Sequence, residues 1–345
     1  MNRELSPGRT RPTLREVASL AGVSIKTASR VVNHESGVMP AKVRAVRQAV
    51  EELDYRPNSL ARGLRLQRSN ILALVSDEIA TTPYAGQMIL GAQEAASRHG
   101  WLLMLVNSGG DVEVEAAEIA ALRQRQVDGF LYATMYHRRV EVAEPLRGVP
   151  TVLLDASADD PSYPSVVPDE RHGGYTATRA LLDAGHTQVA LVNNVDDIPA
   201  TRLRREGYDA ALGEAGLGVD EGLVLVEESL AAGGYRAGGV LLDRDPRPTA
   251  IFCFNDRMAM GVYQAAAERG LRIPEDLSVV GFDNQELIAD GLRPGLTTVA
   301  LPHYEMGAWA VDALIGRIKE PETTAEQALL RCPLVERGSV AAPPA

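Results

Sequence analysis

One short stretch near the N-terminus carries side chains that can hydrogen-bond to nucleic acid. Residues 25–33 read IKTASRVVN, and a helical repeat turns the apolar Ala28, Val31 and Val32 to one side. Cationic and hydroxyl side chains on the opposite face can donate to phosphate oxygens and to the edges of bases. The chemistry that this pattern indicates is DNA recognition. The side chains on that face are Ile25, Lys26, Thr27, Ser29 and Arg30.

Two further short helices are predicted to hold that face in place. Thr13 and Glu16 have the spacing of a capping box, which starts a first helix that ends at Gly22. Ser24 can then cap the second helix. Two helices joined by so short a turn predict a helix-turn-helix, whose second helix enters the major groove. A third helix over residues 40–53 closes the core.

Short amphipathic helices are common, so an ordinary small helical bundle is the alternative for this region. The charge distribution argues against that alternative. Residues 1–68 hold 13 Lys and Arg against 6 Asp and Glu, whereas the whole chain of 345 residues has a net charge of −11. A basic head on an acidic body is typical of a nucleic-acid-binding domain joined to a domain of another kind.

From Asn70 onward, apolar runs of strand length alternate with helical stretches. Continuous apolar runs are typical of parallel strands that are buried on both faces of a sheet. Two successive series of this kind predict two doubly wound α/β lobes with parallel sheets. The runs are ILALVS, WLLMLV, VDGFLYA and PTVLLDA in the first series, and QVALVNN, GLVLVEE, AIFCFND and LSVVGFD in the second.

Composition and motifs argue against several classes of protein, including membrane proteins and enzymes. The first dozen residues are polar, and no apolar run approaches the roughly 20 residues that a membrane span requires. Cys253 and Cys332 lack the spacing of metal ligands, so we expect a cytoplasmic protein without disulfides or a metal site. We find no dinucleotide-binding glycine motif, P-loop, nucleophile elbow or zinc-protease motif. An enzyme is therefore the weakest interpretation, and we expect no cofactor.

Seven blocks, spread in order along almost the whole chain, resemble the LacI/GalR-type family of bacterial transcription regulators. The resemblance implies a helix-turn-helix head, a hinge helix and a two-lobed clamshell similar to the periplasmic binding proteins. It also implies a homodimer that places two heads on palindromic operator DNA. The C-terminal GSVAAPPA has no leucine heptads, so no tetramerisation tail is expected. The blocks are TLREVASLAGVSIKTASRVVN, YRPNSLARGLR, GGYTATRALLDAGH, RREGYDAAL, FNDRMAMG, VVGFDN and LTTVALPHYEMG.

The resemblance also divides the chain, which in this family crosses between the two lobes three times. It implies that LTTVAL and the helix over residues 305–318 return to the first lobe, and that LLRCPLVERGSV finishes in the second. The expected parts are a flexible basic arm (1–12), the helix-turn-helix domain (13–57), a hinge helix or linker (58–68), an N-terminal lobe (69–168 and 299–328) and a C-terminal lobe (169–298 and 329–340).

In the head, Ile25 and Lys26 match the positions by which members of this family select operator bases. Lys26 can donate to guanine, and Ile25 can contact a thymine methyl group unless it is partly buried against the third helix. Hydroxyl and basic neighbours more often hold phosphates. The full set implied for the major groove is Ser24, Ile25, Lys26, Thr27, Ser29, Arg30 and Asn33.

The resemblance implies that a hinge helix pairs with that of the dimer mate in the minor groove. So short a helix is marginal by itself, so it can be ordered on DNA and disordered off it. Leu64 matches the residue that wedges open the central base step. An ordinary linker is the alternative. The implied hinge contacts are Asn58, Ala61, Leu64 and Arg65.

Four residues near the carboxyl ends of strands match the effector pocket of the family. An arginine and two carboxylates in one cleft suit a polyol, because each can form paired hydrogen bonds with neighbouring hydroxyls. Purine-sensing relatives carry aromatic side chains where this chain has Ala156 and Ser229, which favours a carbohydrate. The four are Tyr84, Asp155, Arg204 and Asp256, while Tyr132, Tyr136, Phe282 and His303 could line the pocket or serve packing.

Two of these effector residues have simpler alternatives. Asp256 could serve only to cap its helix, and Arg204 could serve only to form a salt bridge between the lobes.

The predicted function is that of a dimeric, sequence-specific repressor of carbohydrate-utilisation genes that a sugar effector releases from its operator. A purine-corepressed regulator is the alternative within the family. A sugar-binding transport protein would share the clamshell, but it would have no use for residues 13–68.

Overall fold

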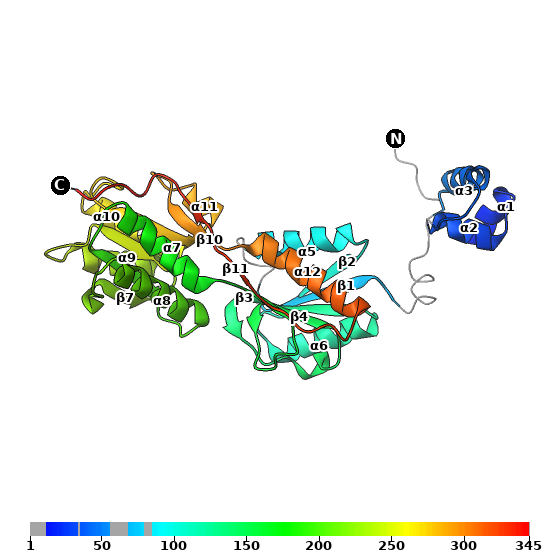
Figure 1. Ribbon diagram of the computed structural model, residues 1–345, viewed down its shortest axis with the longest axis horizontal. Helices are drawn as coiled ribbons and strands as arrows, with labels where there is room; N and C mark the ends of the chain where they lie inside the picture. The colour runs from blue at the N-terminus through cyan, green and yellow to red at the C-terminus, as the bar shows by residue number, and fades with distance from the viewer. Residues whose placement is uncertain (1–11, 34, 56–67, 79–84, 345) are drawn as a thin grey trace. The chain divides into compact units, whose positions relative to one another are not determined.

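The computed structural model describes residues 12–33, 35–55, 68–78 and 85–344, and the chain divides into two units between Ser69 and Asn70 (Figure 1). Within the described ranges, no helix combines the length and the apolar character that crossing a membrane requires. Several predicted residues lie outside these ranges, namely most of the basic arm, the hinge residues Asn58, Ala61, Leu64 and Arg65, and Tyr84.

A three-helix head forms the described part of the N-terminal unit. Its single core joins all three helices through the buried side chains of Val17, Ala28 and Val46. Such a small core is enough to fix the angle between the helices, because each helix contributes apolar side chains to it. The helices are α1 (Leu14–Leu20), α2 (Ile25–Val32) and α3 (Pro40–Leu53).

The caps of the first two helices confirm the predicted helix starts. The Thr13 backbone N–H donates to the Glu16 carboxylate at 2.7 Å, and the Glu16 N–H donates back to the Thr13 hydroxyl, so the capping box is complete. The Ser24 hydroxyl accepts from the Thr27 N–H at the start of α2. Met39 gives α3 no side-chain cap, but Pro40 suits the first helical position.

Six parallel strands form the sheet of the first lobe. Their order is β11-β5-β4-β3-β1-β2, so β11, which comes from near the end of the chain, completes one edge beside β5. The first four strands along the chain correspond to the first predicted series of apolar runs. The strands are β1 (Ile71–Ser76), β2 (Leu102–Asn107), β3 (Gly129–Arg139), β4 (Thr151–Ser157), β5 (Ser165–Pro168) and β11 (Gln327–Leu330).

The second lobe repeats this arrangement in the order β12-β10-β9-β8-β6-β7. All of its pairs are parallel except that of β10 with the two-residue β12, which is an antiparallel edge strand. In both sheets the order of the strands along the chain changes direction at the first strand of the lobe, which is β1 in one sheet and β6 in the other. Doubly wound sheets bind ligands beyond the carboxyl ends of the strands at such a change. The strands are β6 (Val189–Asn194), β7 (Val224–Glu227), β8 (Ala250–Cys253), β9 (Ser278–Asp283), β10 (Thr297–Ala300) and β12 (Leu334–Val335).

Helices cover both faces of each sheet, which gives two doubly wound lobes as predicted. In the first lobe, α12 packs beside α5 over one face, although the two are far apart in sequence, and α6 covers the other face (Figure 1). In the second lobe, α7 packs against α8, and α9 packs against α10. The helices are α5 (Gly86–Arg98), α6 (Val112–Gln124), α7 (Glu170–Asp183), α8 (Pro199–Glu214), α9 (Ala231–Leu242), α10 (Asp256–Glu268) and α12 (His303–Lys319).

One prediction about the crossings between the lobes is wrong in detail. LTTVAL does not return to the first lobe, because β10 pairs with β9 in the second sheet and only the following α12 returns. LLRCPLVERGSV is likewise divided between the lobes. Its first residues belong to β11 in the first sheet, and β12 lies in the second sheet. A four-residue apolar strand can complete either sheet, so its local sequence does not decide between them.

Two glycines let α7 and α8 touch backbone to backbone. A Cβ atom on Gly207 would lie 2.2 Å from the carbonyl oxygen of Arg171, and one on Gly174 would lie 2.3 Å from that of Arg204. Side chains larger than hydrogen cannot fit at such distances without moving a helix. This close crossing brings the first turn of α7, which begins with Glu170, against Arg204 on α8.

Replacing Gly207 with alanine should lower the free energy of unfolding of the sensor by about 1–3 kcal/mol, because overpacking pushes α7 away from α8. Gly213 is the matched control, since it lies on α8 and a Cβ there would meet nothing within 4 Å. Gly213→Ala should be neutral or stabilising by up to about 1 kcal/mol, because alanine favours a helix. Urea unfolding measures both variants, and equal effects would contradict the close-contact explanation.

Candidate functional site

A cavity of about 120 Å³ lies between the two sensor lobes, beyond the carboxyl ends of strands from both sheets. The first lobe supplies Tyr136 and His137 from β3 and Asp155 from β4. The second lobe supplies polar side chains from strand ends and from the starts of helices. Those that matter below are Glu170, Asn194, Arg204, Asn255, Arg257 and Asp283.

Arg204 is held by several partners at once. Its Nε and Nη2 donate to the two carboxylate oxygens of Glu170 at 2.7 and 3.2 Å, and its Nη1 donates to the Phe254 carbonyl oxygen at 2.5 Å. Asp283 lies 3.6 Å from Nη1, and the guanidinium stacks 3.6 Å from the ring centroid of Phe282. Three of the five N–H donors are therefore used within the second lobe. The salt bridge does not connect the two lobes.

Asp155 brings an unpaired carboxyl oxygen into the cavity from the first lobe. The residue is 2% exposed, and its Oδ1 has no hydrogen-bond partner within the described ranges. Its backbone φ of +55° is left-handed, a conformation that Asp tolerates better than most residues. Burial, followed by the negative charge of Glu170, raises the pKa of Asp155 well above its usual value. A buried polar atom without a partner destabilises the protein unless a ligand bonds to it.

Asp256 is not among the residues that line this cavity, unlike the predicted Asp155 and Arg204. Its buried carboxylate accepts from the Thr298 hydroxyl and from the Gln285 backbone N–H, both at 2.6 Å. It thereby ties the start of α10 to β10 and to the loop after β9. The neighbouring Asn255 and Arg257 line the cavity instead, and Asn255 is the residue that caps α10.

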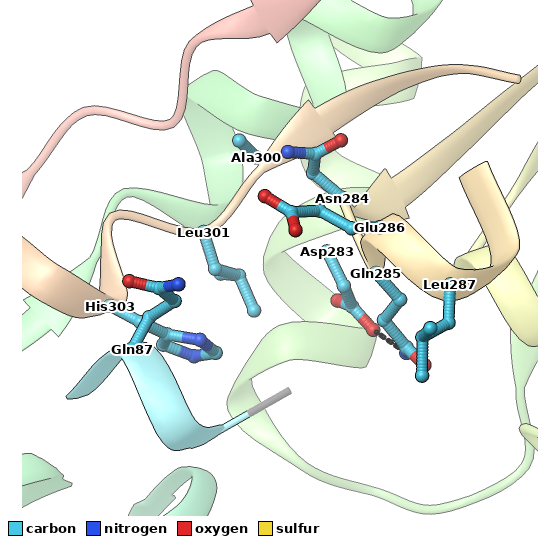
Figure 2. Close-up of a pocket in the computed structure, with 9 residues that line it drawn as sticks. All are labelled: Gln87, Asp283, Asn284, Gln285, Glu286, Leu287, Ala300, Leu301 and His303. Carbon is cyan, nitrogen blue, oxygen red and sulfur yellow. Dashed lines mark hydrogen bonds between the residues drawn. The ribbon is translucent and has the colours of Figure 1, made fainter. Parts of the chain in front are cut away.

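A second cavity, of about 200 Å³, shares Asp283 and Leu301 with the first. Figure 2 shows Gln87 and His303, from the starts of α5 and α12, on one side and the loop after β9 on the other. Leu301, in the segment that crosses between the lobes, lies between these two groups in the view. The shared residues make the two cavities adjoining parts of one cleft.

The loop after β9 has a specific backbone that other side chains hold in place. Asp283 and Asn284 have positive φ values of 97° and 52°. Arg337 Nη2 donates to the Asn284 side-chain oxygen at 2.8 Å, and Gln285 Nε2 donates to the Asp283 carboxylate at 3.0 Å. Burial raises the pKa of Asp283 to about 6, while the positive charge of Arg204 opposes that rise. The loop leads into the short α11 (Glu286–Ala289).

In the head, two side chains of α2 stand out by their exposure. Ile25 is 47% exposed, so it is not buried against α3, and Lys26 is exposed beside it. Arg30 is tied to the head, because its Nη2 donates to the Ser36 carbonyl oxygen at 2.5 Å. The remaining residues predicted for the major groove hydrogen-bond in pairs, Ser24 with Thr27 and Ser29 with Asn33.

Comparison with known proteins gives the family. Residues 13–58 match the bacterial regulatory proteins of the lacI family, and residues 68–337 match the periplasmic binding proteins and sugar binding domain of the LacI family. The chain is 36% identical over 329 residues to the ribose operon repressor of Escherichia coli strain K12, covering 95% of this chain and 99% of that protein. The chain belongs to the LacI family.

Two further LacI-family proteins are similar over nearly the whole chain. The repressor PurR of Vibrio atlanticus is 33% identical over 330 residues, with 95% of this chain and 98% of PurR covered. The structure of the lac repressor dimer bound to operator and the anti-inducer ONPF aligns with a TM-score of 0.77 at 28% identity, over 96% of this chain and 100% of that one.

Membership of the LacI family confirms the predicted fold and the interpretation as a DNA-binding transcriptional regulator rather than an enzyme. Of the predicted effector residues, the structure brings Asp155 and Arg204 together in one cavity, while Asp256 lies elsewhere. Across the described ranges, no group of three or more His, Cys, Asp or Glu side chains is placed to hold a metal ion.

Several residues that line the cavity were not predicted from the sequence. Asn194 and Asp283 each end a strand, so the position of ligands beyond strand ends could have indicated both. Glu170 carries no local signal, because its partner Arg204 lies 34 residues away on another helix. Among the aromatic candidates, Tyr136 lines the first cavity, His303 lines the second, Tyr132 hydrogen-bonds to Glu115, and Phe282 is buried under Arg204.

Replacing Glu170 with alanine should lower the free energy of unfolding by about 3–5 kcal/mol, because a buried guanidinium loses its main counter-charge. Glu206→Ala is the control, since Glu206 pairs with Arg171 across the same two helices but both side chains are more than half exposed. That pair should contribute little. Thermal or urea unfolding compares the variants, and a small effect of Glu170→Ala would contradict the proposed importance of this ion pair.

Proposed function

We propose that this LacI-family regulator is a homodimeric repressor of carbohydrate-utilisation genes, which binds a palindromic operator in the cytoplasm and is released by a sugar. Residues 13–57 would read the operator, residues 58–68 would link head and sensor, and the two lobes would close on the effector. The observation that carries the effector assignment is the cavity between the lobes, where Asp155, His137 and Arg257 present polar atoms that find no partner among the residues that the structure describes.

The exposure of α2 supports the proposed contacts with DNA. Ile25 and Lys26 project from the start of α2, where a recognition helix reaches base edges. Arg30 is bonded within the head, so we assign it a phosphate or positioning role rather than base selection. We keep the proposed minor-groove role of Leu64 and its neighbours, which rests on the resemblance alone.

The cleft supports a polyol effector. Hydroxyl groups can both donate and accept, so neighbouring hydroxyls can bond to the carboxyl of Asp155 and to the donors of Asn194, Asn255 and Arg257. We assign the direct contact at the start of α10 to Asn255 and Arg257, and a positioning role to Asp256. Tyr84 stays a proposed stacking residue on the basis of the resemblance.

A purine corepressor is the second candidate, because PurR of Vibrio atlanticus is similar over almost its entire length. The small side chains of Ala156 and Ser229 argue against it, since a flat purine is commonly held by aromatic stacking. Ser229 lines the cavity but has no ring, so the rings among the lining residues are those of Tyr136, Phe254 and the imidazole of His137.

Fluorescence anisotropy of the full chain on DNA from its own upstream region tests the proposal. We expect tight binding to a palindromic site, with an affinity that falls as salt rises, and release of the DNA by one sugar. Tighter binding in the presence of a purine would instead favour a corepressor system. Failure to bind palindromic DNA at low salt, with or without ligand, would contradict the regulatory function.

Lys26→Ala should weaken binding to the operator by about 1–3 kcal/mol and affect unrelated DNA much less, because a base contact carries specificity. Lys319→Ala is the control, since it removes the same charge from the exposed end of α12 in the sensor. Anisotropy at one fixed salt concentration measures the affinity of each variant for operator DNA and for unrelated DNA. An equal loss on operator and unrelated DNA would assign Lys26 to phosphate contact instead.

A further inference from the structure

Three buried side-chain atoms lack a hydrogen-bond partner in the described part of the chain, and all three belong to residues that line the cavity between the lobes. They are His137 Nδ1, Asp155 Oδ1 and Arg257 Nε. Buried polar atoms in folded proteins are almost always hydrogen-bonded, so an unpaired group requires an explanation. Three such atoms around one cavity indicate the positions where a ligand supplies the missing partners.

The two lobes share these atoms. His137 lies on β3 and Asp155 on β4 of the first lobe, whereas Arg257 lies in the first turn of α10 in the second lobe. His137 and Asp155 are 8% and 2% exposed, so both are at least nine-tenths buried. A ligand that bonds to all three atoms must therefore span the cleft. Its binding would hold the two lobes in one arrangement.

The charge around the cavity restricts what such a ligand can be. Three carboxylates line it beside the buried Asp155, namely Glu170, Asp196 and Asp283, against two arginines, Arg204 and Arg257. Arg204 is already neutralised by Glu170 at 2.7 Å and Asp283 at 3.6 Å. The adjoining cavity adds the carboxylate of Glu286 and has no lysine or arginine among the residues that line it (Figure 2). An anionic ligand would meet an excess of negative charge in a poorly solvated cleft.

We infer that the cleft selects an uncharged polyhydroxy effector, a free sugar rather than its phosphate ester, and that His137, Asp155 and Arg257 bond to its hydroxyls. A hydroxyl suits all three atoms because it donates to a carboxyl oxygen or imidazole nitrogen and accepts from a guanidinium N–H. A phosphate group offers acceptors only, so it suits Arg257 alone. This inference rests on the proposed sugar effector and makes its chemical class narrower.

Isothermal titration of the full chain compares ribose with ribose 5-phosphate and glucose with glucose 6-phosphate. We expect at least one free sugar to bind and its phosphate ester to bind about tenfold more weakly or worse, because each ester adds negative charge to an acidic cleft. A phosphate ester that binds as tightly as its parent sugar would overturn the inference and leave a sugar-responsive regulator in place. Binding of a purine base but of none of these four compounds would overturn the proposed sugar effector itself.

Asp155→Asn tests the role of the buried carboxyl, since asparagine keeps the shape and tolerates the left-handed backbone. We expect a loss of about tenfold or more in affinity for the free sugar, because an amide offers a different set of donors and acceptors from a carboxyl group. Asp159→Asn makes the same change at an exposed residue of the same lobe and should leave that affinity unchanged. An affinity for the free sugar that Asp155→Asn leaves unchanged would overturn the role given to this residue.

His137→Gln gives a second test that does not alter the charge of the cleft. Glutamine keeps a donor and an acceptor but places them differently, so we expect weaker binding of the free sugar with the preference over its ester retained. Unchanged affinity for the free sugar would exclude His137 from the contacts. Binding of operator DNA without effector, measured for each variant, establishes that the variant is folded.

Discussion

The guanidinium of Arg204 sits in the interior of the second lobe, where an unpaired cation would be strongly destabilising. Glu170, the first residue of α7, neutralises this charge. The carbonyl oxygen of Phe254, directly after β8, accepts a hydrogen bond from the guanidinium, and the ring of Phe282 in β9 packs on its face. Satisfying one buried charge therefore fixes α7, α8 and two strand ends relative to one another. The glycine contact between α7 and α8 allows the approach, because any larger residue at Gly207 would separate the two partners. The wall of the cleft follows from this arrangement.

The fold was largely predictable because its signals are local. Thr13 with Glu16 and Ser24 with Thr27 determine where helices of the head begin, whatever the rest of the chain does. Each apolar run of the sensor also contains enough information to become a buried strand. The assignment of β10 and β11 was harder, because their pairing depends on which lobe the chain has reached. Thr297–Ala300 pairs in the second sheet and Gln327–Leu330 in the first, with α12 between them.

The site was less predictable, because its residues meet through long-range contacts. Asp155 was found because it lies near the carboxyl end of a predicted strand, and Arg204 because it lies in RREGYDAAL, a block that resembles the family. Asp256 was placed one residue away from the cavity wall, and a single step along the first turn of a helix turns a side chain from the cleft toward β10. The partnership of Glu170 with Arg204 arises only when α7 crosses α8. No spacing within the sequence encodes that contact.

The two lobes differ in how many of the polar groups that line the cavity have hydrogen-bond partners. Arg204, Glu170 and Asp283 bond chiefly to one another, so the second lobe gains little from a ligand at these groups. In the described part of the chain, the first lobe presents two unpaired buried atoms, on His137 and Asp155, whereas the second lobe presents one, on Arg257. A ligand shifts an equilibrium only through such a difference between states. The first lobe begins with β1, the first described strand after the head, so the lobe with more unpaired atoms is also the one that the chain connects directly to the head.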